Sequence, residues 1–334
     1  MAKKKINIPQ LFKDFTRQRV LVIGDVMIDA YLWGSVERIS PEAPVPIVTV
    51  NTKENRLGGA ANVAINVQAM GATPILCSVI GNGGNARLFY ELMQAQGLSN
   101  EGIVQSTGRP TTYKTRVIGN NHQMLRIDEE TDQEITSAER KQLLERIENI
   151  LSREKIDVII FEDYDKGVMS RQLIEQVVKL AQAHKIPVTA DPKKRNFNHY
   201  KNISLLKPNL KELREGSKLD VEKGDVNEIK AAAARLCKEN AIQWVMITLS
   251  ERGVFIYNKS ENHLIPAHIR NIADVSGAGD TVISVASLCL AAGCDSYLTA
   301  SLANLAGGLV CEKVGVAPIE KNKLLHEALH IKPA

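Results

Sequence analysis

The stretch Asp274-Val275-Ser276-Gly277-Ala278-Gly279-Asp280 is a glycine-rich loop that runs directly into an apolar segment. Gly277, Ala278 and Gly279 at a helix start would let several backbone N–H groups converge, and the helix dipole would add positive potential. Such a site favours a bound phosphate or a developing negative charge. Asp280 would repel a phosphate, but it suits a general base that takes a proton from a hydroxyl during phosphoryl transfer. Taken alone, the motif fits a plain helix-capping turn equally well.

The composition is that of a globular protein with reduced cysteines. The 334 residues are 44% hydrophobic and 24% charged, which allows one large α/β domain or two small ones. A net charge of +4 and 4% aromatic residues predict no nucleic-acid partner. The apolar run 282–292 is too short to span a membrane, and no signal-peptide core follows the basic N-terminus. Five cysteines without a C-x-x-C pair also favour a cytoplasmic protein that does not contact membranes.

Strand and helix patterns alternate along most of the chain. Apolar, β-branched runs predict buried strands at 20–23, 74–81, 156–161, 187–190 and 244–249. Helical patterns fall between them at 85–96, 136–152, 171–184 and 226–240. This alternation predicts an α/β fold with a doubly wound, mainly parallel sheet and helices on both faces. We find no repeat or long linker, so we expect residues 1–334 to form a single domain.

Polar side chains follow the ends of several predicted strands, namely Asp25, Asp163, Asp191, Asn209 and Thr248. Strand ends converge on one edge of a doubly wound sheet, so we expect these side chains to share one ligand site. Carboxylates such as Asp25 and the nearby Asp29 can each accept two hydroxyl hydrogen bonds, which suits a polyol. The alternative is that one of these two aspartates caps the next segment.

Two extended segments interrupt the alternation. Residues 31–50 contain Pro41, Pro44 and Pro46 and end in an edge strand, and residues 111–127 contain a hairpin signal. Inserted strands of this kind predict a small separate β sheet. We expect it to act as a lid that excludes water from the reactive phosphate.

Gly58 and Gly59 open a segment of small residues that carries Asn62. Paired glycines let a ligand approach the backbone closely, and Asn62 offers both a donor and an acceptor. A helix packed tightly on the sheet would explain the alanines here, but not the two glycines together with Asn62.

These two glycine motifs carry a family resemblance. Residues 274–280 resemble the carboxy-terminal signature of the ribokinase-like (PfkB-type) carbohydrate kinases, and residues 58–62 resemble their amino-terminal signature. The resemblance covers nearly the whole chain and implies a ribokinase-like fold with ATP- and Mg²⁺-dependent phosphorylation of an alcohol. It implies that Asp280 is the catalytic base and that the N–H groups of 277–279 form the anion hole. It also implies a homodimer paired through the lid.

The resemblance extends to a metal and triphosphate motif. Asn209-Leu210-Lys211-Glu212 matches the N-x-x-E motif of the family. Asn209 and Glu212 would hold magnesium through water, because a hard cation prefers oxygen ligands and keeps several waters. The alternative is a helix cap with glutamate in the first turn.

Further nucleotide contacts are implied at the strand end near Thr248. Thr248, Ser250 and Gly253 match a family loop beside the nucleotide, although Ser250 stands where glycine is usual. Lys193 would face the ATP phosphates. Asn304 would form part of the adenine wall, with a packed alanine-rich helix as the equal alternative.

On the acceptor side, the positions that match sugar-hydroxyl contacts are Asp25, Asp29, Gly58, Gly59 and Asn62. The leading candidates to bind a phosphate on the sugar are Lys114 and Arg126, with Lys53, Arg56 and Arg116 as further basic residues. Each of these could equally be a solvated surface charge.

Four stretches, 24–29, 39–46, 163–167 and 208–212, resemble members that phosphorylate D-glycero-β-D-manno-heptose 7-phosphate at O1 in ADP-heptose and lipopolysaccharide synthesis. Glu162 departs from that pattern, in which we expect a small residue or serine. No H-x-G-H motif is present, so we expect a stand-alone kinase without a nucleotidyltransferase domain.

Three functions are alternatives to a heptose-phosphate kinase. The first is another PfkB-type kinase for a sugar, a sugar phosphate or a nucleoside. The second is a non-catalytic sugar sensor, which the presence of Asp280 disfavours. The third is a dinucleotide-dependent oxidoreductase, which is disfavoured because the first strand ends without a G-x-G-x-x-G motif.

Overall fold

The structure is a computed structural model that describes residues 7–218 and 225–331; the basic N-terminus lies outside these ranges. Within them, the largest element is a nine-stranded sheet with the order β13-β12-β11-β10-β9-β8-β1-β4-β5. From β5 to β11 the neighbouring strands are parallel, and β12 and β13 are added antiparallel at one edge. The strands of this main sheet are β1 (Arg19–Gly24), β4 (Thr73–Ile80), β5 (Gly102–Gln105), β8 (Val158–Glu162), β9 (Val188–Asp191), β10 (Leu205–Leu206), β11 (Trp244–Thr248), β12 (Val254–Tyr257) and β13 (Asn262–Ile265).

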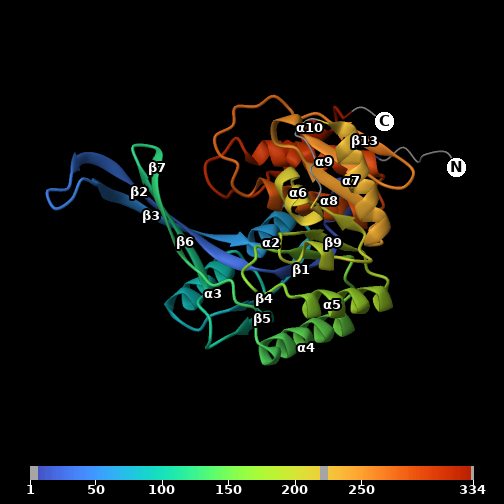
Figure 1. The fold of residues 1–334 in the computed structure, drawn as a ribbon, viewed down its shortest axis with the longest axis horizontal. Helices are drawn as coiled ribbons and strands as arrows, with labels where there is room; N and C mark the ends of the chain where they lie inside the picture. The colour runs from blue at the N-terminus through green and yellow to red at the C-terminus, as the bar shows by residue number, and fades with distance from the viewer. Residues whose placement is uncertain (1–6, 219–224, 332–334) are drawn as a thin grey trace.

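Helices cover both faces of the main sheet, because successive side chains of its strands point into two different cores. On β1, Val22 belongs to one core and its neighbour Leu21 to the other. Figure 1 shows α4 and α5 on the face opposite to α8 and α9. The first core packs against α1 (Ile8–Phe15), α2 (Ala60–Ala69), α3 (Gly84–Ala95), α8 (Ala278–Ala291), α9 (Ser296–Val310) and α10 (Lys321–Ala328). The second packs against α4 (Ser137–Arg153), α5 (Arg171–His184), α6 (Leu210–Ser217) and α7 (Val226–Glu239).

The predicted α/β fold with a doubly wound, mainly parallel sheet is therefore confirmed. The order of the strands places β1 third from the β5 edge, with β4 on one side and β8 on the other. Among the described helices, none combines the length and the apolar character needed to cross a membrane.

The chain leaves the main sheet at a single residue. β1 ends at Gly24 and the next strand, β2 (Val26–Ile39), begins at Val26, so only Asp25 lies between them. A Cβ atom on Gly24 would lie 2.0 Å from the carbonyl oxygen of Glu162 on β8. Glycine is therefore required where the two strand ends approach each other.

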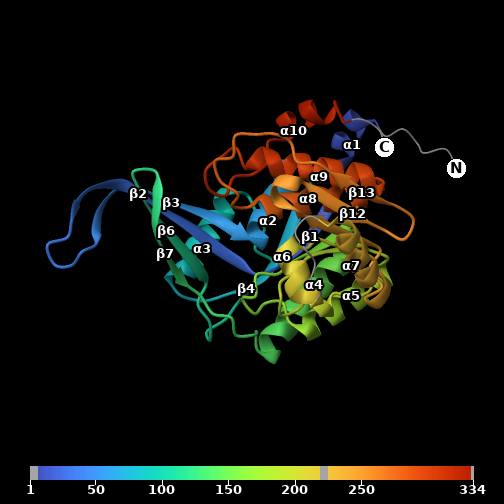
Figure 2. The same ribbon diagram turned by 45° about the horizontal axis from the view of Figure 1, so that its top comes forward.

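The described residues also form a second, four-stranded sheet with the order β3-β2-β6-β7, which we call the small sheet. Figures 1 and 2 both show its long β2–β3 hairpin extending away from the helices and the main sheet. Its remaining strands are β3 (Pro46–Gly59), β6 (Thr112–Gly119) and β7 (His122–Glu129). The extended segments predicted at 31–50 and 111–127 lie in this sheet, although β2 and β3 continue to Val26 and Gly59.

The two faces of the small sheet differ in polarity. The strand register aligns Asp29 of β2 with Lys114 of β6, and Lys114 with Asp128 of β7. The alternating residues Leu125 and Ile127 point to the opposite face, where they are 56% and 49% exposed. One face is thus charged and the other carries exposed apolar side chains.

Candidate active site

The loop 274–277 leads directly into α8, whose first turn begins with residues 278–280, and the sequence predicts this helix start. Gly277 is the N-cap and has a φ of 78°, a left-handed conformation that favours glycine. A Cβ atom at this position would also lie 2.9 Å from Nδ2 of Asn62. The N–H of Ala278 donates to the carbonyl of Val275 at 3.3 Å, so one of the predicted anion-hole donors already has a partner.

Asp280 is buried in the first turn of α8 with both carboxylate oxygens held. Asn62 Nδ2 donates to Oδ2 at 2.6 Å, and the Tyr164 hydroxyl donates to Oδ1 at 2.7 Å. Burial raises the pKa of Asp280, while these two hydrogen bonds favour its ionised form and oppose the increase. Asn62 is oriented in turn by Asn66, whose Nδ2 donates to its Oδ1 at 3.2 Å.

Asp25, which is predicted to bind sugar hydroxyls, is engaged by the protein backbone in this structure. Its carboxylate accepts backbone N–H groups from Tyr164 at 2.8 Å, Lys166 at 3.1 Å and Val168 at 2.9 Å. Both oxygens are therefore used to hold the loop after β8, and the side chain is 1% exposed. This loop supplies Tyr164 to Asp280, so Asp25 acts on the site through the backbone.

Asp163 stabilises the same loop from its other side. Asn196 Nδ2 donates to Oδ2 at 3.0 Å and the Tyr200 hydroxyl donates to the same oxygen at 2.8 Å. Burial, and then the charge of Asp25, raise the pKa of Asp163 to about 7.

A buried ion pair lies beneath the first turn of α8. Lys207 Nζ lies 2.7 Å from Asp191 Oδ2, and both side chains are at most 5% exposed. A Cβ atom on Gly279 would lie 3.5 Å from this nitrogen and 3.6 Å from this oxygen. Lys207 is not among the site residues predicted from the sequence, although a lysine at the end of an apolar strand is a usable signal.

The N-x-x-E segment forms a helix cap. Asn209 Oδ1 accepts the N–H of Glu212, and Glu212 Oε2 accepts the N–H of Asn209, both at 2.8 Å. The other oxygen of Glu212 accepts a hydrogen bond from Lys193. The helix cap that was the alternative for this motif is thus present. Lys193 is linked to the cap through its hydrogen bond to Glu212.

Glu162, at the end of β8, is fully buried. Burial, followed by the charges of Asp191 and Asp280, raises its pKa well above the usual value. Neither of its carboxylate oxygens accepts a hydrogen bond from any described residue.

The residues predicted to contact the nucleotide lie at the end of β11, in the turn that follows it and on α9. Thr248 ends β11, and Ser250 has a φ of 54°. A positive φ favours glycine, so Ser250 adopts a backbone conformation that glycine reaches more easily. Gly253 has a φ of 90°, and Asn304 of α9 donates to the carbonyl of Pro266 at 2.8 Å.

On the acceptor side, Gly58 and Gly59 complete β3, and Gly59 is also the N-cap of α2. Arg116 Nη1 donates to Asp29 Oδ1 at 2.5 Å. A Cβ atom on Gly58 would lie 2.1 Å from the other oxygen of Asp29, so the glycine leaves room for this carboxylate. Arg116 also lies 5.3 Å from the ring centroid of Tyr31.

The two leading cations for a sugar phosphate already have acidic partners. Lys114 lies 3.2 Å from Asp128 and 2.5 Å from Glu130, and Arg126 lies 2.9 Å from Asp128. The pairing of β6 with β7 brings Asp128 beside both cations.

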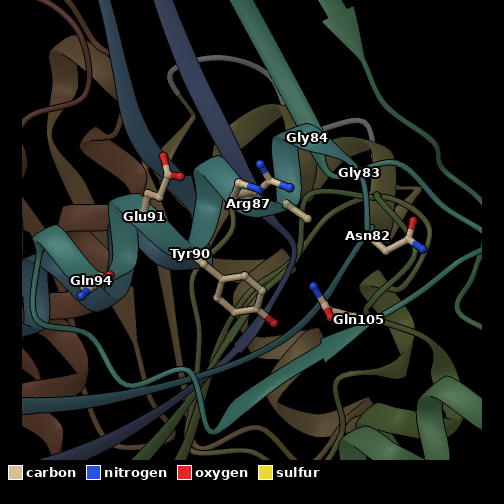
Figure 3. Close-up of a pocket in the computed structure, with 9 residues that line it drawn as sticks. Asn82, Gly83, Gly84, Arg87, Tyr90, Glu91, Gln94 and Gln105 are labelled. Atoms are coloured by element: carbon tan, nitrogen blue, oxygen red, sulfur yellow. The ribbon is translucent and has the colours of Figure 1, made fainter.

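Two cavities differ in their relation to these residues. Figure 3 shows a cavity of about 580 Å³, in which Arg87 and Tyr90 of α3 face Gln105 of β5; none of the predicted site residues lines it. A second cavity of about 440 Å³ is lined by Asn62, by residues of β3 and by residues 313–318. The second cavity therefore borders the predicted site.

Residues 17–322 match the model of the pfkB family of carbohydrate kinases. The chain belongs to this family. It is 41% identical over 311 residues to the bifunctional protein HldE of Desulfatibacillum aliphaticivorans, covering 93% of this chain and 63% of that protein. It is 37% identical over 316 residues to bifunctional protein HldE of Helicobacter hepaticus, covering 95% and 64%. The chain thus spans less than two thirds of the length of these relatives.

Solved structures of the same fold are more distant in sequence. Escherichia coli phosphofructokinase-2 in complex with potassium has a TM-score of 0.77 and 17% identity, covering 94% of this chain and 99% of that one. Arabidopsis thaliana ribokinase complexed with ribose and ATP has a TM-score of 0.71 and 15% identity, with the same coverage. At this identity the likeness establishes the ribokinase-like fold, and family membership makes the chain an ATP-dependent carbohydrate kinase.

The role of Asp25 can be separated from substrate binding by measuring stability. We expect Asp25→Ala to lower the free energy of unfolding by about 3–5 kcal/mol, because three backbone N–H groups lose a charged acceptor. Urea unfolding followed by circular dichroism measures this change. The control is Asp14→Ala on α1, which removes a half-exposed carboxylate that accepts only a side-chain hydrogen bond from Gln10, and it should change stability by less than about 1 kcal/mol. Unchanged stability with a raised KM for the sugar would instead make Asp25 a substrate ligand.

Proposed function

We propose that the chain phosphorylates D-glycero-β-D-manno-heptose 7-phosphate at O1, with ATP as the donor. The product would be the 1,7-bisphosphate, an intermediate of ADP-heptose synthesis for lipopolysaccharide cores. The observation that carries a kinase mechanism is the placement of Asp280, held by Asn62 and Tyr164 at the start of α8. The choice of acceptor is supported by the HldE relatives, which match at least 93% of the chain.

In the proposed reaction, Asp280 accepts the proton of the O1 hydroxyl while that oxygen attacks the γ-phosphorus of ATP. The bond to the bridging oxygen breaks and ADP leaves, with the proton remaining on Asp280. The N–H groups of the first turn of α8, with Gly279 at their centre, favour the negative charge of the transferred group. Lys193 and Lys207 supply positive charge near the same point.

Magnesium fits the chemistry of this site. Glu212 has both oxygens engaged by Asn209 and Lys193, so it would contact a cation through water, as proposed for the N-x-x-E motif. When bound, the metal would neutralise charge on the phosphates of ATP. No group of three or more His, Cys, Asp or Glu side chains among the described residues is arranged to hold a metal by itself.

For the acceptor, Asp29 and the backbone at Gly58 and Gly59 would hold hydroxyls. Lys114 and Arg126 would bind the 7-phosphate by exchanging their contacts with Asp128 for the phosphate oxygens. Arg116 is a further candidate, because it lies at the same face of the small sheet. Thr248, Ser250, Gly253 and Asn304 would line the nucleotide side.

A comparison of acceptors tests the proposed activity. With ATP and Mg²⁺, we expect ADP release to favour the heptose 7-phosphate over ribose, fructose 6-phosphate and adenosine by at least about 100-fold in kcat/KM. Asp280→Asn is the matched control, with kcat lowered by about 10²–10⁴-fold because the base is lost. Activity on a different acceptor only would favour another PfkB-type kinase. Nucleotide binding without any transfer would favour a sugar sensor.

The role of Tyr164 can be tested through the pH dependence of kcat. Its hydrogen bond favours the ionised form of Asp280, so Tyr164→Phe should raise the pKa of that carboxyl. The reaction needs Asp280 ionised, so the acid limb of the pH profile should move to higher pH. We also expect kcat at neutral pH to fall about tenfold. Tyr90→Phe on α3 should leave the profile unchanged, and an unshifted limb in Tyr164→Phe would contradict the assignment.

We also propose a cytoplasmic homodimer in which residues 1–334 form one kinase domain and the small sheet serves as lid and interface. The apolar face that carries Leu125 and Ile127 supports this pairing, because exposed apolar side chains gather there.

We expect light scattering to give a dimer mass for the wild type and a monomer mass for the double variant Leu125→Lys, Ile127→Lys. Two lysines on this face would place like charges opposite one another across the interface. Leu329→Lys, at a residue that is 54% exposed outside the small sheet, is the matched control and should remain dimeric. A wild-type monomer at all concentrations would overturn the proposed interface.

A further inference from the structure

The fully buried carboxylate of Glu162 has no partner among the described residues. Both Oε1 and Oε2 lack a hydrogen bond, and the same is true of Oδ1 of the neighbouring Asp191. Among the described residues, these two neighbouring side chains thus have three buried carboxylate oxygens without a hydrogen bond. Buried polar groups of this kind are almost always hydrogen-bonded, paired or bound to a metal ion, because desolvation is otherwise costly.

Glu162 and Asp191 lie side by side. They end the neighbouring parallel strands β8 and β9 and are directly aligned in the strand register. Aligned residues on adjacent parallel strands project from the same face of the sheet, with their strands about 4.8 Å apart. The first turn of α8 lies over this edge, since Asp191 Oδ2 is 3.6 Å from the place of a Cβ atom on Gly279.

The charges around these oxygens do not balance. Glu162, Asp191 and Asp280 are buried carboxylates that carry three negative charges when ionised, whereas Lys207 supplies one positive charge beside Asp191. Lys193 is matched by its own partner, Glu212. Two negative charges therefore remain, and they would repel a triphosphate at the same edge of the sheet. A divalent cation supplies the missing charge and prefers carboxylate oxygens as ligands.

We propose that Glu162 and Asp191 bind one divalent cation of the magnesium class in the absence of nucleotide. The cation would contact the three unsatisfied oxygens and complete its coordination with water. The site is in place before the triphosphate arrives and is distinct in its ligands from the water-mediated contact of Glu212. The inference uses the proposed phosphoryl-transfer site only for its location and does not depend on which sugar is the acceptor.

Manganese titration of the nucleotide-free protein tests this site. Mn²⁺ takes similar oxygen ligands, and the loss of its free electron paramagnetic resonance signal measures binding. We expect one site in the EDTA-treated, re-dialysed wild type, and affinity lowered at least about tenfold in Glu162→Gln. Glu175→Gln, which removes an exposed carboxylate on α5 paired with Arg171, is the matched control and should bind like the wild type.

Thermal unfolding provides a second readout that does not involve catalysis. Without metal, Glu162→Gln should unfold at the wild-type temperature or above it, because a buried carboxyl group without a hydrogen-bond partner is replaced by a neutral amide of similar size. Mn²⁺ should raise the unfolding temperature of the wild type and of Glu175→Gln, but not that of Glu162→Gln. Glu162→Ser, the residue type expected at this position in related kinases, should likewise lose the increase.

Two results would overturn the proposal. One is a nucleotide-free wild type that binds no Mn²⁺, in which case Glu162 holds a proton. The other is equal Mn²⁺ affinity in the wild type and Glu162→Gln, which would place the cation elsewhere. Neither result bears on the acceptor comparison, which measures ADP release with nucleotide and sugar present, so the two proposals fail independently.

Discussion

The carboxylate of Asp25 organises the centre of this molecule. It stands at the one residue between the main sheet and the small sheet, and it accepts three N–H groups from the loop after β8. That loop carries Tyr164, which donates to Asp280 on α8. Three segments far apart in the sequence are thus held together by one buried side chain. The energy of burying its charge is offset by these charge-assisted hydrogen bonds.

The edge of the sheet around Asp280 contains more negative than positive charge. Such an arrangement is unfavourable for the folded state alone, and functional sites are where proteins retain groups of this kind. Lys207 and Lys193 lower the repulsion, but no described residue donates a hydrogen bond to the carboxylate of Glu162. Under the proposed cation binding, a divalent ion would supply the charge that these residues leave unmatched.

Much of this could be predicted from the sequence where the signal is local. The alternation of strands and helices gave the fold, and the glycines at 277 and 279 marked the start of α8 beside Asp280. The role of Asp25 could not be predicted, because its partners lie 139 to 143 residues away along the chain. The same holds for Lys114 and Arg126, whose acidic partners depend on the register of β6 and β7. For Asn209 and Glu212, the local capping signal correctly described their contacts.

The points where β2 and β3 join the rest of the chain connect the small sheet to the surroundings of Asp280. β2 starts directly after Asp25, which holds the loop of Tyr164, and β3 ends directly before α2, which carries Asn62. The start of β2 and the end of β3 are hydrogen-bonded to each other, since the N–H of Ala60 donates to the carbonyl of Asp25 at 2.9 Å. Both donors to Asp280 are therefore attached where the long hairpin meets the body of the molecule. Any displacement of the hairpin relative to the main sheet would therefore be transmitted directly to the two groups that orient the carboxylate of Asp280.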